Sequence, residues 1–221
     1  MDRKEIKKRA KEIIKGNKWK ILWPLLVISL ISNVLNNFIG PKYDIDVNSI
    51  TKLEDLANLT LPTPTPTQAI LSGLVSLLVL SLGVAYIKYL LKIVRGEEPE
   101  FNDIINCFKE RWATILLVEL VGGVIIVLFS LLLVIPGIIR AIAYAMTSYI
   151  VVETDLSFEN VLKKSRSMMN GYKWDYFVFM LSFIGWMLLA PFTLFILLIW
   201  LIPYMIVAKA LYYEKLKEIN G

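Results

Sequence analysis

The chain has 221 residues, of which 57% are hydrophobic and 12% aromatic, and its mean hydropathy is +0.61. Soluble domains usually hold roughly 45–50% apolar residues, and here the excess is gathered into runs long enough to cross a bilayer. The sequence has no histidine and a single cysteine, Cys107, which excludes an intrachain disulfide and catalysis by Ser/His or Cys/His pairs. We therefore expect no catalytic residue, no cofactor and no metal site.

The net charge of +5 is distributed as in a membrane protein and not as in a nucleic-acid binder. Nine of the 24 lysines and arginines lie between Arg3 and Lys20, directly before the first apolar run. Basic residues beside a span orient that span and attract anionic headgroups. We expect membrane lipids with anionic headgroups as partners on the cytoplasmic side, and no nucleic acid. A membrane-protein partner or a second copy of the chain stays open.

Residues 1–18 predict a basic amphipathic helix that lies on the membrane. Asp2 and Glu5 have the spacing of a capping box at its start. Its lysines and arginines surround one apolar face, which is the pattern of an interfacial helix. The side chains of that face are Ile6, Ala10, Ile13 and Ile14.

Six transmembrane helices follow, each judged against the ~20 residues that cross ~30 Å of hydrocarbon. In chain order they are predicted at residues 19–39, 69–94, 112–133 and 136–152, with two more inside residues 174–213. The last two turn between Ala190 and Leu194 if Pro191 marks the turn, and Pro203 then kinks the sixth helix. The alternative turn is at Pro203. Residues 40–67, which end in alternating proline and threonine, predict an extracytoplasmic loop.

The charges of the connecting segments alternate along the chain. The segments at residues 96–111 and 154–173 are charged, whereas the turns near Pro136 and Pro191 carry no charge. Twenty basic residues lie on the side of the N-terminus and two, Lys42 and Lys52, on the opposite side. The positive-inside rule then predicts a multi-pass protein of the cell membrane with both termini in the cytoplasm.

Each charged segment contains a further amphipathic helix at the cytoplasmic interface. The first apolar stripe is Phe101, Ile104, Ile105, Phe108 and Trp112, and the second is Phe158, Val161, Leu162, Ser165, Met168, Met169 and Tyr172. A basic residue and a tryptophan follow each of the three amphipathic helices, at residues 18–19, 111–112 and 173–174. The predicted fold is a single all-α membrane domain over residues 1–221, built of three hairpins, each preceded by a cytoplasmic amphipathic helix. Whether these units are true repeats stays open.

Short motifs in a fixed order carry a family resemblance. They are residues 15–19 (KGNKW), 95–99 (RGEEP), 135–139 (IPGII), 144–146 (YAM), 171–174 (GYKW), 181–186 (LSFIGW), 201–204 (LIPY) and 212–214 (YYE). With them the chain resembles the bacterial integral membrane family called domain of unknown function 975. It is more distantly similar to the membrane domain attached to some glycerophosphodiester phosphodiesterases. The resemblance implies a multi-pass bacterial membrane protein without an established activity, and it assigns no catalytic residue.

Four ionisable residues inside apolar runs form the candidate intramembrane polar site: Lys88, Glu119, Arg140 and Lys209. At about 1.5 Å per helical residue, Glu119 and Lys88 lie ~10 Å below the cytoplasmic interface and Lys209 ~7–8 Å. Because a glutamate is too short to reach the headgroups, we predict that Glu119 points into the bundle. We expect it to meet Lys88 or Lys209, directly or through water. This pairing is read as a structural ion pair or, alternatively, as part of a cation or proton path.

Arg140 differs from the other three in depth. It follows Pro136 by four residues, which predicts a position in the outer half of the bilayer. Asn33, Asn36 and Asn37 near the outer end of the first span are its candidate partners.

These features lead to two hypotheses about function. The first is an uncharacterised, non-enzymatic bacterial membrane protein that acts through lipid or partner proteins, using its three amphipathic helices. The second is a small transporter or channel with a polar site near Glu119. A water-filled cavity that reaches Glu119 would favour transport, whereas an interfacial groove in a sealed bundle would favour lipid or partner binding.

Overall fold

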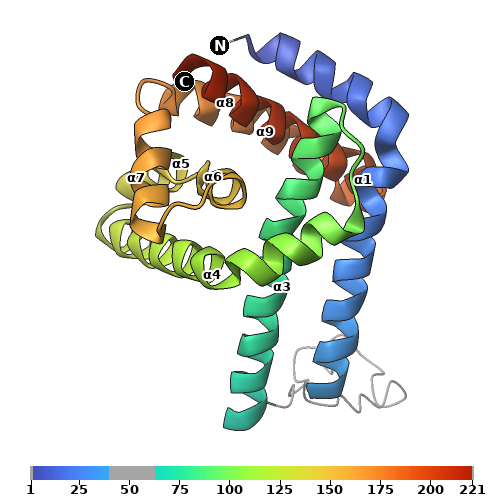
Figure 1. Cartoon of the computed structure of the whole chain (residues 1–221), viewed down its shortest axis with the longest axis vertical. Coiled ribbons are helices and arrows are strands. Elements are labelled where there is room, and N and C mark those ends of the chain that lie inside the picture. Colours follow the sequence, from blue (N-terminus) through green and yellow to red (C-terminus); the bar gives the residue numbers. More distant parts are fainter. Residues whose placement is uncertain (1, 40–62, 221) are drawn as a thin grey trace. The chain divides into compact units, whose positions relative to one another are not determined.

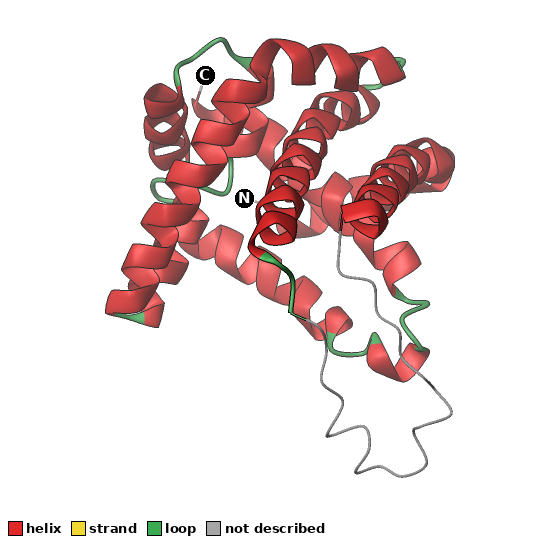
Figure 2. Ribbon diagram, turned by 90° about the horizontal axis from the view of Figure 1, so that it is seen from below, coloured by secondary structure: helices red, strands yellow, loops and turns green. Residues whose placement is uncertain are grey.

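The computed structural model describes residues 2–39 and 63–220, and the regular elements in these two ranges are helices (Figures 1 and 2). In chain order they are α1 (Arg3–Ile39), α3 (Pro66–Arg95), α4 (Phe101–Leu132), α5 (Val134–Ala143), α6 (Thr147–Glu153), α7 (Phe158–Met168), α8 (Lys173–Met187), η2 (Pro191–Thr193) and α9 (Leu198–Asn220). The all-α class is thereby confirmed. Most of the predicted extracytoplasmic loop, residues 40–62, lies outside the described residues.

Four helical segments are long and apolar enough to cross a membrane: Arg3–Ile39, Pro66–Arg95, Phe101–Leu132 and Val134–Glu153. Helix α8 has only 15 residues, which span about 22 Å against the ~30 Å of a hydrocarbon core. Helix α9 carries charged residues over its last turns. The described residues thus form an all-helical protein with four candidate spans, and the predicted count of six is not confirmed.

The chain divides into two compact units, and the predicted single membrane domain stays a prediction. The first comprises Met1–Leu25 and Ser81–Gly221, and the second comprises Leu26–Leu80. In the second unit many large apolar side chains are exposed, and polar groups bond inside their own helices. The amide of Asn36 donates to the carbonyl of Ser32 at 2.9 Å, and the hydroxyl of Ser76 donates to that of Ser72 at 2.8 Å. Such local bonds satisfy polar side chains without water.

Helix α1 bends at Asn17, whose φ of −125° and ψ of 18° are not helical. This position agrees with the predicted boundary between residues 1–18 and the first apolar run. At the start of the helix the backbone N–H groups of Glu5 and Lys4 donate to the carboxylate of Asp2. These two bonds favour the ionised form and hold the pKa of Asp2 below its ordinary value.

The apolar face of residues 1–18 is buried in protein, whereas the sequence predicted that it lies on lipid. Ile6, Ala10 and Ile14 are all buried. The basic side chains beside this face contact the last two helices. Lys7 Nζ donates to Ser182 Oγ at 2.5 Å, and Lys18 Nζ lies 3.4 Å from the centroid of the Trp200 ring. An apolar stripe marks a face that must be covered, but its period does not say whether lipid or protein covers it.

The second predicted amphipathic helix, at residues 96–111, is not a separate element. Residues 96–100 form a turn and an extended segment, and α4 then runs without interruption from Phe101 past Trp112 to Leu132. No glycine or proline stands between Phe101 and Trp112 to break the helix. The third amphipathic helix is a separate element, α7, and its predicted apolar residues Val161, Leu162, Ser165 and Met168 are buried.

Helices α4 and α5 form a tight hairpin around Leu133, whose backbone is extended with φ −162° and ψ 142°. The hairpin requires glycine at position 137. A Cβ atom added to Gly137 would lie 2.0 Å from Ser130 Oγ and 2.8 Å from Ser130 Cα. Backbone approach at this distance is open only to a residue without a side chain, which gives a physical reason for the Pro136-Gly137 sequence.

The fourth predicted span, residues 136–152, is broken in the middle. Helix α5 ends at Ala143 and α6 begins at Thr147, with a turn between them. The hydroxyl of Thr147 donates to the carbonyl of Tyr144 at 2.8 Å, and that of Ser165 on α7 donates to the carbonyl of Ala143 at 2.9 Å. The backbone N–H of Thr147 also donates to the carbonyl of Tyr144, at 3.2 Å, so backbone and side-chain donors together serve the carbonyl groups at the break.

Helices α8 and α9 are joined by an apolar turn that contains η2. Leu194 and Phe195 have φ values of 49° and 63°, in the left-handed region that non-glycine residues seldom adopt. The reversal follows Pro191, and Pro203 lies inside α9. Of the two predicted turns, the one at Pro191 is therefore correct.

A group of charged and phenolic side chains joins α3, α6 and α9. We name Arg95, Glu153, Tyr213, Glu214 and Lys217 the paired cluster. Arg95 donates to both carboxylates, at 2.7 Å to Glu214, and Glu153 also accepts from Tyr213 at 2.8 Å and from Lys217 at 2.9 Å. Each charge in this cluster therefore has an oppositely charged neighbour from another helix or another part of the chain.

Candidate functional site: a basic cavity

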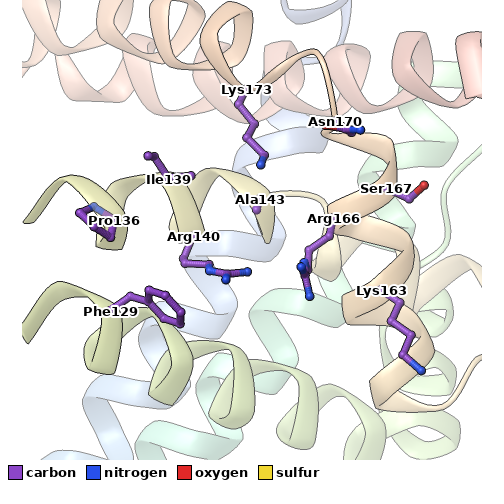
Figure 3. A pocket seen from close by; sticks show the side chains of 10 residues that line it. All are labelled: Phe129, Pro136, Ile139, Arg140, Ala143, Lys163, Arg166, Ser167, Asn170 and Lys173. Carbon is purple, nitrogen blue, oxygen red and sulfur yellow. The ribbon is translucent and has the colours of Figure 1, made fainter. Parts of the chain in front are cut away.

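A cavity of about 670 Å³ lies between α4, α5, α7 and the start of α8 (Figure 3). Its lining residues are Phe129, Pro136, Ile139, Arg140, Ala143, Lys163, Arg166, Ser167, Asn170 and Lys173. We name it the basic cavity. Its size is within the range of about 300–1,000 Å³ that is usual for ligand sites.

The wall formed by α7 is held in place by contacts on three sides. Helix α7 packs against α4 and α6 (Figure 1). The buried hydroxyl of Ser165 bonds to the carbonyl of Ala143 at the end of α5, as described above. Leu162 of α7 packs against α4 at Gly122, with its Cδ2 atom 3.7 Å from the position that a Cβ would take. These contacts fix α7 opposite the α4–α5 hairpin and leave its polar face toward the cavity.

The entry into α7 and the exit from it are also fixed. Arg111 on α4 donates to the carbonyl groups of Thr154 and Leu156, just before α7. After α7 the chain reverses at Gly171, whose φ of +82° is readily adopted only by glycine. This reversal returns Lys173, the first residue of α8, to the rim of the cavity.

Four basic side chains line the cavity: Arg140, Lys163, Arg166 and Lys173. Figure 3 shows the guanidinium groups of Arg140 and Arg166 turned toward one another, with the ammonium group of Lys173 directed into the same space and Lys163 turned outward. The guanidinium of Arg140 lies 4.3 Å from the centroid of the Phe129 ring. Stacking on a ring face fixes a guanidinium while its edge stays free to donate hydrogen bonds.

No acidic residue lines this cavity, and within residues 2–39 and 63–220 none of its four cations forms an ion pair. Elsewhere in the same unit Arg3, Arg95 and Arg111 pair with carboxylates. Cations brought together without an acid repel one another, and this repulsion is larger where protein excludes water. An anion in the cavity would remove it. The apolar side chains on the α4–α5 side would cover a hydrophobic portion of the same ligand.

Of the four residues of the predicted polar site, only Arg140 lines the cavity. The structure puts it with side chains of the segment at residues 154–173. The asparagines of the first span belong to the other compact unit, so their contact with Arg140 stays a prediction. The carboxylate of Glu119 accepts a hydrogen bond from Ser148 at 2.7 Å. In the described part of the chain it forms no direct ion pair with Lys88 or Lys209, and the pairing through water stays a prediction.

The two lysines lie elsewhere. Lys88 is partly buried on α3, within electrostatic range of Asp103, but Asp103 forms its ion pair with Lys92 at 2.7 Å. Lys209 is partly buried on α9. The structure therefore does not bring the four predicted residues together into one site.

Sequence reasoning missed three members of the cavity: Lys163, Arg166 and Lys173. They were counted among the basic residues that orient the chain, because a charged segment beside a span has that role by default. The available signal was the spacing of the first two, which puts both on the face of α7 opposite its buried stripe. The connection to Arg140 could not be read from the sequence, since it depends on how α7 packs.

The sequence matches one known family along nearly its whole length. The family is described as "Protein of unknown function (DUF975)", and the match covers residues 1–142 and 119–220. No curated protein and no solved structure matched the chain. The more distant similarity to the membrane domain of glycerophosphodiester phosphodiesterases is therefore not shown.

Proposed function

Because the chain belongs to the DUF975 family, whose function is unknown, we propose a function from its own geometry: a non-enzymatic bacterial membrane protein that binds anionic phospholipid in the basic cavity. A phospholipid has the two chemical parts that the lining offers, since a phosphate suits the cations and acyl chains suit the apolar wall. The observation that carries this proposal is a set of four cations that, among the described residues, form no ion pair and share their cavity with no carboxylate.

The leaflet that supplies the lipid follows from the charged segments. Lys163 and Arg166 belong to the segment at residues 154–173, which the distribution of basic residues assigns to the cytoplasm. Anionic lipids of the cytoplasmic leaflet attract basic side chains by about 1 kcal/mol each. Because α7 runs along α4 from Arg111 toward Phe129, we propose that the headgroup enters from that leaflet beside α7 and reaches Arg140 deeper in the bilayer.

The membrane arrangement in this proposal has six spans in three hairpins, with both termini in the cytoplasm. The four candidate spans support the first two hairpins. For the third, the exposed apolar residues of the α8–α9 turn, such as Phe192 and Leu194, support insertion into lipid. Since α8 is short, this hairpin crosses by thinning the bilayer or by including the turn in the apolar region.

The residues that line the cavity argue against the alternative function, a transporter with a site near Glu119. That residue does not line the basic cavity, and its carboxylate is bonded to Ser148. This arrangement supports lipid binding over ion transport through Glu119.

Lipid copurification tests the proposed function. The full-length protein would be purified from nanodiscs of phosphatidylcholine that also contain phosphatidylglycerol, and bound lipid would be quantified by mass spectrometry. We expect enrichment of phosphatidylglycerol over the bulk bilayer, with a loss of about tenfold in Arg140→Gln or Arg166→Gln, since a hydrogen bond to a charged group contributes about 1.5–3 kcal/mol. Lys164→Gln, an exposed neighbour on α7 outside the lining, is the matched control. Equal enrichment in all four proteins would refute the proposal.

Cysteine labelling tests the six-span arrangement separately. In a Cys107→Ser background, single cysteines within residues 40–67 should react with impermeant reagents on intact cells. Cysteines at Asp103 and Asn160 should not react, and a cysteine at Thr193 should react only if the α8–α9 hairpin crosses. Labelling of Asp103 or Asn160 from outside would contradict the proposed orientation.

A further inference from the structure

The two arginines of the basic cavity indicate which kind of anion the cavity binds. Arg140 projects from α5 and Arg166 from α7, and their guanidinium groups face each other across the cavity (Figure 3). Planar guanidinium groups bind phosphate through two parallel N–H···O bonds, so two facing arginines need an acceptor with several free oxygens between them. Lys173 adds a third donor group directed into the same space.

The charge of the site also favours a phosphate group with several free oxygens. Arg140, Arg166 and Lys173 point into the cavity and Lys163 turns outward, and no carboxylate among the described lining residues offsets them. A phosphodiester headgroup brings one negative charge and two unesterified oxygens. A phosphomonoester brings about −1.5 to −2 charges near neutral pH and three terminal oxygens, because its second pKa is about 6. The monoester thus comes closer than the diester to the three positive charges, and its three terminal oxygens equal the three donor groups in number.

The remaining space fits a lipid that carries such a group. The cavity volume of about 670 Å³ exceeds that of a phosphate ion several-fold. The walls beyond the arginines are apolar, with Phe129, Pro136 and Ile139 from the α4–α5 hairpin. We propose that the basic cavity selects lipids whose headgroup ends in a terminal phosphomonoester, with Arg140 and Arg166 as the two residues that determine specificity. This inference rests on the proposed function and narrows it to one headgroup chemistry.

A comparison of two anionic lipids tests the inference. The full-length protein in phosphatidylcholine nanodiscs would be titrated with phosphatidic acid, a phosphomonoester, or phosphatidylglycerol, a phosphodiester. We expect phosphatidic acid to bind about tenfold more tightly at neutral pH, as one additional charge-assisted hydrogen bond provides. The preference should shrink as the pH falls through about 6, where the monoester loses its second charge. Arg140→Lys and Arg166→Lys should keep binding of both lipids but lose most of the preference, because lysine retains the charge without the planar fork.

The possible results separate the two proposals. Equal binding of the two anionic lipids, both above phosphatidylcholine, would overturn the phosphomonoester inference and leave the proposed function standing. Binding of neither above phosphatidylcholine would overturn both. Glycerol 3-phosphate provides the same terminal phosphate without acyl chains. If it displaces phosphatidic acid at equal concentration, the ligand is a soluble phosphate ester and the lipid assignment is wrong. Lys164→Gln, with its unfolding midpoint recorded beside those of the arginine variants, controls for loss of charge and of fold.

Discussion

The paired cluster and the basic cavity contain the same kinds of side chain in opposite arrangements. In the paired cluster Arg95 and Lys217 share Glu153, and Arg95 also binds Glu214. In the basic cavity Arg140 and Arg166 face each other, and none of the described residues that line the cavity is acidic. The first arrangement is complete within the chain. The second has no carboxylate among the described lining residues, and in our proposal a ligand supplies the missing negative charge.

If the proposed function holds, this difference separates charges that hold the fold together from charges that bind a ligand. Removing one partner of a buried ion pair lowers the stability of the fold, because the remaining charge is left unpaired in a low dielectric. A cation surrounded by like charges costs stability while it is present. Substitutions in the two regions should therefore change the free energy of unfolding with opposite sign when no ligand is bound.

The largest effect is expected at the centre of the paired cluster. Glu153→Ala removes an acceptor of three hydrogen bonds and leaves Arg95, Lys217 and the hydroxyl of Tyr213 without it. We expect a loss of about 2–3 kcal/mol, at the lower end for broken buried pairs because Arg95 keeps Glu214 and is partly exposed. Thermal unfolding in neutral detergent measures this loss. Asp155→Asn is the control. The carboxylate of Asp155 also pairs with an arginine, Arg111, but it is fully exposed, so its loss should leave the unfolding midpoint unchanged. Similar midpoints for the two variants would contradict the structural role of the cluster.

The next largest effect is expected at Gly137, and it tests whether the shape of the cavity depends on the close packing of the α4–α5 hairpin. Gly137→Ala puts a methyl group against Ser130 and should force α5 away from α4, at a cost of about 1–2 kcal/mol. Because α5 carries Pro136 and Arg140, anionic-lipid binding should weaken as well. Gly123→Ala is the matched control, since a Cβ at that position meets no atom within 4 Å. If both alanine variants unfold at the same temperature, the close approach at Gly137 has no energetic importance.

The sequence predicted the elements of the fold better than their contacts. Apolar runs gave the helices, and Pro191 gave the last turn, because proline and hydrophobic period act locally. The break between α5 and α6 was missed, since residues 142–149 include neither proline nor glycine. It is stabilised from outside by Ser165, more than twenty residues away. The number of residues from the interface also predicts the depth of Glu119 in the membrane. It does not predict which side chain Glu119 contacts, because that depends on how the helices pack.

In the basic cavity the expected effect on stability is small and favourable. Arg166→Gln removes one of the two facing guanidinium groups and should raise the free energy of unfolding by up to about 1 kcal/mol in neutral detergent without anionic lipid. In the presence of phosphatidylglycerol the wild-type protein should gain more stability than the variant, because only a ligand of the folded state stabilises it. Unfolding midpoints with and without the lipid measure both effects. A clear loss of stability in lipid-free detergent would place Arg166 with the paired residues instead.

The smallest effect is expected at Glu119, which belongs to neither region. A carboxylate paired with a buried lysine would make Glu119→Gln costly, as the sequence suggested. In the structure its partner is the hydroxyl of Ser148, at 2.7 Å. Glutamine has the same shape and keeps a carbonyl oxygen that accepts this bond, so the change in unfolding free energy should stay within about 0.5 kcal/mol. Glu119→Ala should cost more, because it removes the acceptor and leaves the Ser148 hydroxyl without this bond. The opposite result would be a large loss of unfolding free energy in Glu119→Gln that Lys88→Met or Lys209→Met reverses. It would show that Glu119 forms an ion pair with that lysine, and that a second group of paired charges stabilises this fold.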